Sequence, residues 1–283
     1  MKKIIGLIFP FERDLYNQQG LHLIECSFSG KEDGESALKE CSDILCERTT
    51  FALRYPLWHC LNVSLDQVNM LDTCRASLWY TEQVKICNSN LNGIKALREC
   101  LNINIFNSNI VSDEFGWKCK NIKCDKSVIK GNYLFFESKD IELDNSFISG
   151  KYNFQYVNNV TLNNCIVESK DFFWHAKDVI IKDSVIKGEY LAWYSENLTL
   201  INCKISGTQP FCYCKNLKLI NCEMIDTDLS FEYSEVEAII NGTIKSVKNP
   251  LKGKIEADLI EEIILTEDKK YLCEAIIYER ERM

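Results

Sequence analysis

The chain has little of the two residues that break regular structure and separate domains. It contains only 4 prolines and 12 glycines among 283 residues, so no flexible linker is evident and no low-complexity run is present. A Gly-rich phosphate loop between a strand and a helix is also missing, which argues against a nucleotide-binding enzyme. We therefore expect a single domain over residues 1–283, with neither a cofactor nor a bound metal.

Long apolar runs and a positive net charge are missing as well. No segment approaches the roughly 18 apolar residues of a membrane helix, and the net charge of −8 argues against nucleic-acid binding and, weakly, against anionic membranes. The start, MKKIIGLIFPFERDLY, resembles a signal peptide only superficially, because Pro10 interrupts its apolar run and charged residues follow. We expect a cytoplasmic protein with no nucleic-acid or membrane partner.

Cysteine, by contrast, is abundant. A secreted protein with fifteen cysteines would contain disulfides and one spare thiol. The spacings, including Cys212-Tyr213-Cys214, do not resemble a zinc pattern. A free cysteine behaves as a small buried hydrophobe, and the repeat described next gives most cysteines such a place. We therefore expect reduced, mostly buried thiols.

A nineteen-residue repeat dominates the chain. FFWHAKDVIIKDS (172–184) returns nineteen residues later as LAWYSENLTLINC. Copies of this length begin on an aliphatic residue at Val84, Ile103, Ile122, Ile141, Val160, Val179, Leu198 and Leu217. Copies at Leu21, Ile44 and Val63 precede them, some with extra turn residues, which makes about eleven copies over residues 21–235.

Within a copy the pattern is that of short strands joined by polar turns. Positions one and three are aliphatic, as in Val160 and Leu162, which indicates one buried face. Position five is often Asn or Asp, and position six is Ser or Cys from Val84 onward. Such repeats are typical of solenoids, and nineteen is not a multiple of the six residues of left-handed hexapeptide helices.

The sequence therefore predicts an all-β fold, a single-stranded right-handed parallel β-helix. It would have about eleven coils over residues 21–253, with an N-terminal cap at 1–20 and a C-terminal cap at 254–283. Caps are expected because the end coils of a solenoid expose apolar faces and unpaired edges.

Several stretches also resemble a known family. GESALKE (34–40), RYPLWH (54–59), RASLWY (75–80), GIKALREC (93–100) and FWHA (173–176) are similar to an uncharacterised bacterial family catalogued as domain of unknown function 3737. The resemblance covers nearly the whole chain and implies a right-handed β-helix of the pectin-lyase-like type. It implies no established activity and no catalytic residues.

Large side chains gather on the predicted third strand of each coil. Segments such as LWHC (57–60), LWYT (78–81), FWHA (173–176) and AWYS (192–195) place two large residues between an apolar and a small one. A bulge or bend is needed for both to face outward. The candidate ligand-binding residues are Arg54, Trp58, His59, Arg75, Trp79, Tyr80, Trp117, Tyr156, Trp174, Trp193 and Tyr194, and the candidate catalytic residues are Arg98, Glu99, Lys118, Glu137 and His175.

Two interpretations of this strip stay open. The tryptophans are either core stacks or an exposed surface whose ring faces stack on sugar rings, since an exposed row of tryptophans is costly unless something binds there. The charges Glu99, Lys118 and Glu137 alternate in sign, which also suits simple cross-strand pairing.

Two functions follow from the strip. The first is binding of a carbohydrate or another elongated ligand without catalysis. The alternative is a glycoside hydrolase or polysaccharide lyase: Glu99 and Glu137 would lie roughly 9–10 Å apart, marginally compatible with inverting hydrolysis, and Arg98, Lys118 or His175 could serve a lyase. We expect an oligosaccharide or polysaccharide ligand and leave a homo-oligomer open.

Overall fold

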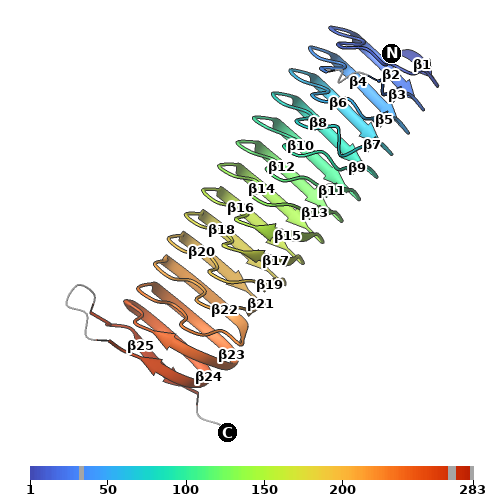
Figure 1. Ribbon diagram of the computed structural model, residues 1–283. Coiled ribbons are helices and arrows are strands. Elements are labelled where there is room, and N and C mark those ends of the chain that lie inside the picture. Colours follow the sequence, from blue (N-terminus) through green and yellow to red (C-terminus); the bar gives the residue numbers. More distant parts are fainter. Residues whose placement is uncertain (32–34, 267–271, 281–283) are drawn as a thin grey trace. The chain divides into compact units, whose positions relative to one another are not determined.

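The computed structural model describes residues 1–31, 35–266 and 272–280 (Figure 1). The chain divides into two compact units, Met1–Glu142 (unit 1) and Leu143–Met283 (unit 2), and each is described by itself. Every regular element among these residues is a β-strand, which confirms the all-β prediction. Over the same ranges, no helix has the length and apolar character needed to span a membrane.

Unit 1 is a parallel β-solenoid whose coils each combine a long strand, a short strand and a turn segment. Its long strands are β1 (Lys2–Ile5), β2 (Gln19–Ile24), β4 (Ser42–Glu47), β6 (Leu61–Asp66), β8 (Glu82–Cys87), β10 (Leu101–Phe106) and β12 (Lys120–Asp125). Its short strands are β3 (Ser27–Phe28), β5 (Thr50–Phe51), β7 (Asn69–Met70), β9 (Asn90–Leu91), β11 (Asn109–Val111) and β13 (Val128–Lys130). The boundary between the units falls within β14 (Lys139–Asp144).

Unit 2 is built in the same way. Its long strands are β16 (Asn158–Asn163), β18 (Lys177–Lys182) and β20 (Glu196–Ile201), and its short strands are β15 (Phe147–Lys151), β17 (Ile166–Lys170), β19 (Val185–Lys187) and β21 (Lys204–Ser206). The chain then forms β22 (Lys215–Ile225), β23 (Glu235–Lys248), β24 (Lys252–Ile264) and β25 (Ile276–Glu279). Strands therefore continue past residue 254, where the sequence predicts a C-terminal cap.

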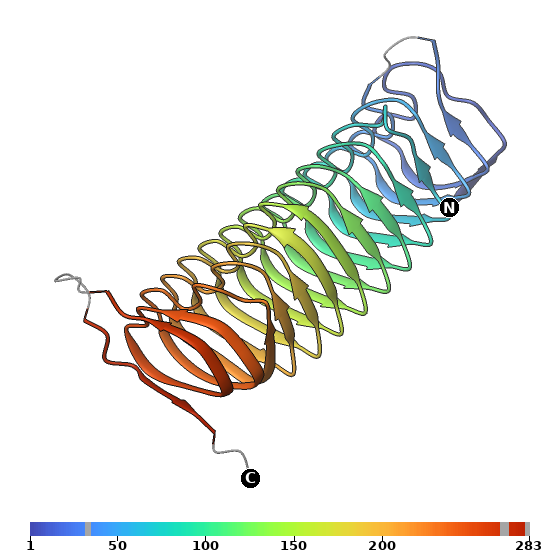
Figure 2. The ribbon, with the colours of Figure 1, turned by 60° about the horizontal axis from the view of Figure 1, so that its bottom comes forward.

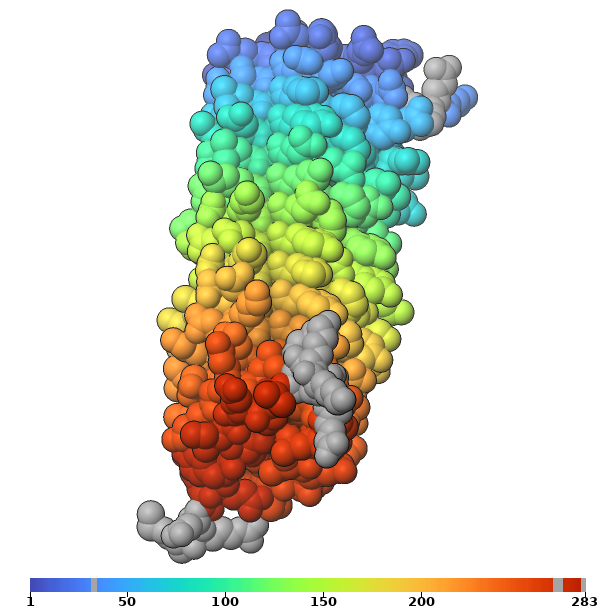
Figure 3. All heavy atoms as spheres, turned by 90° about the vertical axis from the view of Figure 1, so that its left-hand side faces the viewer, coloured from blue at the N-terminus to red at the C-terminus, as the bar shows by residue number. Residues whose placement is uncertain are grey.

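Strand register confirms the nineteen-residue repeat. In unit 1, Ile103 lies opposite both Val84 and Ile122. In unit 2, Val179 lies opposite both Val160 and Leu198. These are the first residues of successive copies, so like residues stack at the spacing of neighbouring strands, about 4.8 Å. Figure 2 shows the strands of each unit as stacked arrows, and Figure 3 shows the coils of each unit as successive bands in chain order.

Columns of like residues also fill the interior. The rings of Phe28 and Phe51 stack with centroids 4.7 Å apart and planes only 1° from parallel. Burial of positions one and three, as at Val63 and Leu65, removes a continuous apolar surface from water, which is the main source of folding free energy. The core is thus a set of columns, each continued by the next coil.

The Asn/Asp position of the repeat marks a corner of the coil. Asn107, Asn164 and Asn202 there have φ values between +45° and +53°, a left-handed conformation that Asn tolerates better than most residues. Their amides also form ladders between coils, for example from Asn107 Nδ2 to Asn88 Oδ1 at 2.8 Å. This explains why the position favours Asn over residues of similar size.

Ser, Thr and Cys side chains form a buried column that donates hydrogen bonds to backbone carbonyls beside the turn segment. The thiol of Cys100 donates to the carbonyl of Leu78 at 2.6 Å, and the hydroxyl of Ser195 donates to that of Phe173 at 2.5 Å. All fifteen cysteines are free, and all but Cys87 and Cys273 are buried. Burial raises the pKa of the thiol of Cys214, a member of this column, well above its ordinary value, so it stays protonated and inert. The predicted place of the cysteines in small-residue columns is confirmed.

Candidate functional site

The segment predicted as the third strand is not a strand. It is a run of turns in which every second residue has a positive φ, such as Leu57 at +60° and His59 at +54°. This conformation costs about 1–2 kcal/mol for a side chain with a Cβ. Hydrogen bonds between coils offset the cost, because Leu57 N donates to Ala37 O and His59 N donates to Trp79 O, both at 2.9 Å.

The alternating backbone determines where the side chains lie. Leu57 and Cys60 are buried, Trp58 is half-buried and His59 is exposed, so the simple in–out alternation of a strand is lost. The same order recurs in later coils. We call the half-buried positions the inner column, which includes Trp58, Trp79, Arg98, Trp117 and Phe136 in unit 1 and Gln155, Trp174 and Trp193 in unit 2. The positions that follow them form the outer column, which includes His59, Tyr80, Glu99, Lys118 and Glu137 in unit 1 and Tyr156, His175, Tyr194 and Tyr213 in unit 2.

The inner column of unit 1 is a closed stack. The indoles of Trp58 and Trp79 lie 4.9 Å apart and within 3° of parallel. The guanidinium of Arg98 lies between two indoles, 4.4 Å from the centroid of Trp79 and 4.9 Å from that of Trp117. Its Nη2 also lies 3.2 Å from Glu114 Oε2. Arg98, predicted as a catalytic residue, is therefore held in cation–π and ionic contacts.

The inner column of unit 2 has the same geometry. The indoles of Trp174 and Trp193 lie 5.6 Å apart and within 2° of parallel. In both units each indole nitrogen donates to a backbone carbonyl of the next coil, and the pairs are Trp58–Ala76, Trp79–Lys95, Trp117–Tyr133, Trp174–Tyr190 and Trp193–Gln209. Within each stacked pair the neighbouring indole covers one ring face, so a sugar ring cannot stack on the faces that the two indoles turn toward each other.

The outer column of unit 1 mixes rings and charges. The rings of His59 and Tyr80 stack at 4.8 Å. Lys118 Nζ lies 3.6 Å from Glu137 Oε2, with both side chains about half exposed, and Glu99 is exposed. The charge pairing that the alternating signs suggested is therefore present between Lys118 and Glu137. Exposed pairs of this kind add little stability.

The outer column of unit 2 is an uninterrupted aromatic stack, which we call the tyrosine column: Tyr156, His175, Tyr194 and Tyr213. Its centroid distances along the column are 5.0, 5.1 and 4.6 Å, and its planes are within 10° of parallel. Tyr156 is 50% exposed and Tyr194 is 46% exposed. Burial, followed by the nearby Glu232, raises the pKa of the Tyr213 phenol, so its hydroxyl remains a donor at neutral pH.

The two remaining predicted residues lie beside the inner column of unit 1. The guanidinium carbons of Arg54 and Arg75 are 5.2 and 6.0 Å from the ring centroid of Tyr55, whose ring is tilted against Trp58 at 5.1 Å. Arg54 also approaches Glu35 at 3.8 Å. The structure thus brings the predicted residues together as two groups of side chains, one in unit 1 and the other in unit 2.

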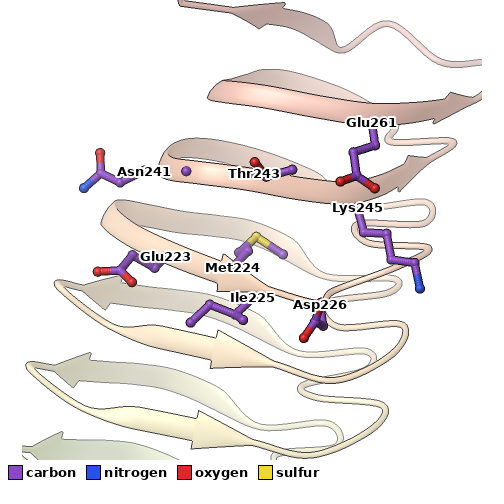
Figure 4. A pocket seen from close by; sticks show the side chains of 9 residues that line it. Glu223, Met224, Ile225, Asp226, Asn241, Thr243, Lys245 and Glu261 are labelled. Atoms are coloured by element: carbon purple, nitrogen blue, oxygen red, sulfur yellow. The ribbon is translucent and has the colours of Figure 1, made fainter.

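A hollow in unit 2 was not anticipated from the sequence. It has a volume of about 370 Å³ and is lined by Glu223, Met224, Ile225, Asp226, Asn241, Gly242, Thr243, Lys245 and Glu261 (Figure 4). The pairing register shifts between Leu219 and Cys222, and again between Ile240 and Thr243. Such bulges redirect side chains. The only signal in the sequence is that the copy that begins at Leu217 is the last one in the nineteen-residue series.

Charges of both signs surround this hollow. Glu223 pairs with Lys204 at 3.3 Å, while Asp226, Lys245 and Glu261 come from three different stretches of chain around the opening (Figure 4). In residues 1–31, 35–266 and 272–280 no group of three or more His, Cys, Asp or Glu side chains is arranged to hold a metal ion. The hollow therefore carries charges of both signs, and the residues that the structure describes form no metal centre there.

Comparison with known protein families decides the relationship suggested by the motifs. The model of a family described as Protein of unknown function (DUF3737) matches residues 2–278. The chain belongs to this family. The resemblance expected from stretches such as RYPLWH and FWHA is confirmed. No curated protein matches the chain.

Solved structures show only remote likeness. The A-module of mannuronan C-5 epimerase AlgE4 from Azotobacter vinelandii is 7% identical, with 92% of this chain and 84% of that one covered and a TM-score of 0.29. A mutant of the periplasmic alginate epimerase AlgG is 10% identical, with 92% and 76% covered and a TM-score of 0.30. The catalytic domain of a GH87 alpha-1,3-glucanase in complex with nigerose is 7% identical, with 98% and 63% covered and a TM-score of 0.20. Similarities this low bear on neither the fold nor the activity of this chain.

Proposed function

We propose that the protein is a binding protein that holds an elongated, hydroxyl-rich ligand, an oligosaccharide or polysaccharide, along the tyrosine column of unit 2. The observation that carries the proposal is the uninterrupted stack of Tyr156, His175, Tyr194 and Tyr213, of which the first three are exposed. Large exposed aromatic patches on a soluble protein are uncommon unless something binds there.

The contacts would be made by ring edges. Stacking covers the faces of the rings, with planes within 10° of parallel from Tyr156 to Tyr213. The edges carry phenol hydroxyls and imidazole nitrogens, which donate and accept hydrogen bonds. A sugar chain presents hydroxyl groups that do the same, so a row of polar edges suits a row of hydroxyls.

The repeat spacing supports an elongated ligand over a compact one. Successive rings are 4.6 to 5.1 Å apart, so the same group recurs at each coil. A repetitive ligand can use several such contacts at once, and each contact adds to affinity once the first has positioned the chain.

A catalytic role for the side chains of the inner and outer columns has less support. Glu137 is about half exposed and paired with Lys118, and Arg98 is held between two indoles. The hollow near Glu223 is lined by other residues. Binding without catalysis therefore fits this geometry better.

The test is a screen of oligosaccharides and polysaccharides by calorimetry, repeated with Tyr194→Phe. This variant keeps the ring stack and removes one hydroxyl, so we expect affinity to fall by about 0.5–1.5 kcal/mol, roughly twofold to twelvefold, with an unchanged melting temperature. Tyr80→Phe, the same change in the outer column of unit 1, is the matched control and should bind as the wild type does. A complete screen without saturable binding, or equal affinity for Tyr194→Phe, would contradict the proposal.

A further inference from the structure

An amide ladder at the start of the long strands in unit 1 is interrupted at one coil. Asn62 Nδ2 donates to Asp43 Oδ1 at 2.7 Å, and Asn121 Nδ2 donates to Asn102 Oδ1 at 2.6 Å. Gln83 stands between these two pairs with φ +58°, the same backbone conformation as Asn62 and Asn102. Within the described residues its side-chain amide has no hydrogen-bond partner.

The interruption has a steric cause. Glutamine is one methylene longer than asparagine, so its amide cannot take the rung between its neighbours. Across the part of the chain that the structure describes, Asn62 Oδ1 then lacks the donor that a ladder would supply, and Asn102 Nδ2 lacks the acceptor. One acceptor and one donor are left two rungs apart, about 9.6 Å, with the rung between them unfilled.

A hollow of about 240 Å³ lies at this interruption. Its polar lining is Asn62, Ser64, Gln83, Lys85, Asn102 and Asn104, with Val84 beneath. The lining contains no carboxylate, although the chain carries a net charge of −8. The volume is below the roughly 300–1,000 Å³ of sites for drug-sized ligands, so the hollow is suited to one small ring.

Lys85 differs from a lysine at the same position two coils on. Lys123 Nζ lies 2.9 Å from Glu142 Oε2, whereas Lys85 has no ion pair among residues 1–31, 35–266 and 272–280. An unpaired ammonium beside unpartnered amides favours a ligand that carries both hydroxyls and one negative charge.

We propose that this hollow binds a single sugar ring, and that a ring with a carboxylate binds more tightly than its neutral counterpart. A hydroxyl group both donates and accepts, so one ring can supply a donor to Asn62 and an acceptor to Asn102. The carboxylate pairs with Lys85. The site lies in unit 1 on β6, β8 and β10 and is independent of the tyrosine column.

Glucuronate and glucose at millimolar concentrations, followed by NMR chemical-shift changes, test the proposal. Gln83→Asn restores the ladder and fills the gap, so it should weaken glucuronate binding at least about tenfold and leave the melting temperature equal or higher. Lys85→Gln should abolish the preference for glucuronate over glucose.

The matched control is Asn197→Gln, which interrupts the amide ladder of unit 2, where Asn197 donates to Asp178 and accepts from Asn216. It should lower the melting temperature and leave glucuronate binding unchanged. Undetectable binding of both sugars, or equal binding by Gln83→Asn, overturns the inference. Chemical-shift changes at Asn62, Gln83 and Asn102, without changes at the tyrosine column, would place the bound sugar at this hollow, so failure here and failure at the tyrosine column are distinguishable.

Discussion

The turn segments of the two units have the same backbone and carry different chemistry. In unit 1 the inner column contains Arg98 between two indoles, and the outer column contains the ion pair Lys118–Glu137. In unit 2 the outer column is an aromatic stack from Tyr156 to Tyr213. The repeat therefore fixes where a side chain lies, and the residue type decides whether its polar groups are used within the fold or presented to a ligand.

One position shows the difference most directly. Glu114 and Asp171 each lie three residues before an inner-column tryptophan. Glu114 approaches Arg98 at 3.2 Å and Lys95 at 3.4 Å. Asp171 is buried, and this burial raises the pKa of its carboxyl group. A carboxylate is thus stabilised by cations in unit 1 and penalised by desolvation in unit 2.

The largest expected effect tests whether the inner column is structural in both units. Trp117→Ala and Trp174→Ala should each lower the free energy of unfolding by about 3 kcal/mol, because each removes an indole that packs against neighbouring rungs and donates a hydrogen bond. Urea unfolding followed by circular dichroism measures this. Ligand affinity at the tyrosine column should change little.

The control is Trp174→Phe, which retains a stacking ring and loses only the indole donor to Tyr190 O. It should cost about 1 kcal/mol. A loss below about 1 kcal/mol in either alanine variant, together with weaker ligand binding, would instead make that tryptophan a binding residue.

A smaller effect tests the cation in unit 1. Arg98→Ala removes two cation–π contacts and one ion pair, so the free energy of unfolding should fall by about 2 kcal/mol. Arg98→Lys should recover only part of this loss, since an ammonium group cannot stack as a planar guanidinium does. The measurement is again urea unfolding.

Gln155→Ala is the comparison in unit 2, at an inner-column position without a cation. It should change the free energy of unfolding by about 0.5 kcal/mol or less. Full recovery of stability by Arg98→Lys would show that charge alone, and not stacking, holds the column of unit 1 together.

The sequence predicts the coils well because one physical cause acts at every repeat. Aliphatic residues at Val160 and Leu162, and at the same positions of other copies, must be buried together, so the register follows. The amide and Ser/Cys columns follow from the same stacking. Membership of the family was predictable as well, because the motifs that identify it lie in the turn segments and can be read directly from the sequence.

The site is less predictable because it depends on local backbone conformations. A positive φ at a buried leucine such as Leu57 opposes ordinary residue preferences, so the segment was expected to be a strand. The hollow near Glu223 depends on two register shifts that only the paired strands reveal. The interruption at Gln83 becomes visible only when the hydrogen bonds on either side are known.

The smallest expected effect concerns Glu114 and Asp171, the two carboxylates that lie three residues before an inner-column tryptophan. Because the folded-state pKa of Asp171 is raised above its ordinary value of 3.8, ionisation of this group destabilises the fold. The penalty is absent below the unfolded pKa, where the group is protonated in both states, and it grows as pH rises through the folded pKa. Asp171→Asn should therefore raise the free energy of unfolding at pH 7 by about 0.5 kcal/mol.

The gain should shrink as the pH falls toward 3.8, which thermal unfolding across a pH series measures. Backbone strain does not confound the comparison, since Asp171 has φ +54° and asparagine accepts this conformation as readily as aspartate. Glu114→Gln should have the opposite sign at pH 7, with a loss of about 0.5–1 kcal/mol that salt reduces, because it removes contacts with Arg98 and Lys95. The same sign for both substitutions would mean that burial and pairing do not distinguish the two units at this position.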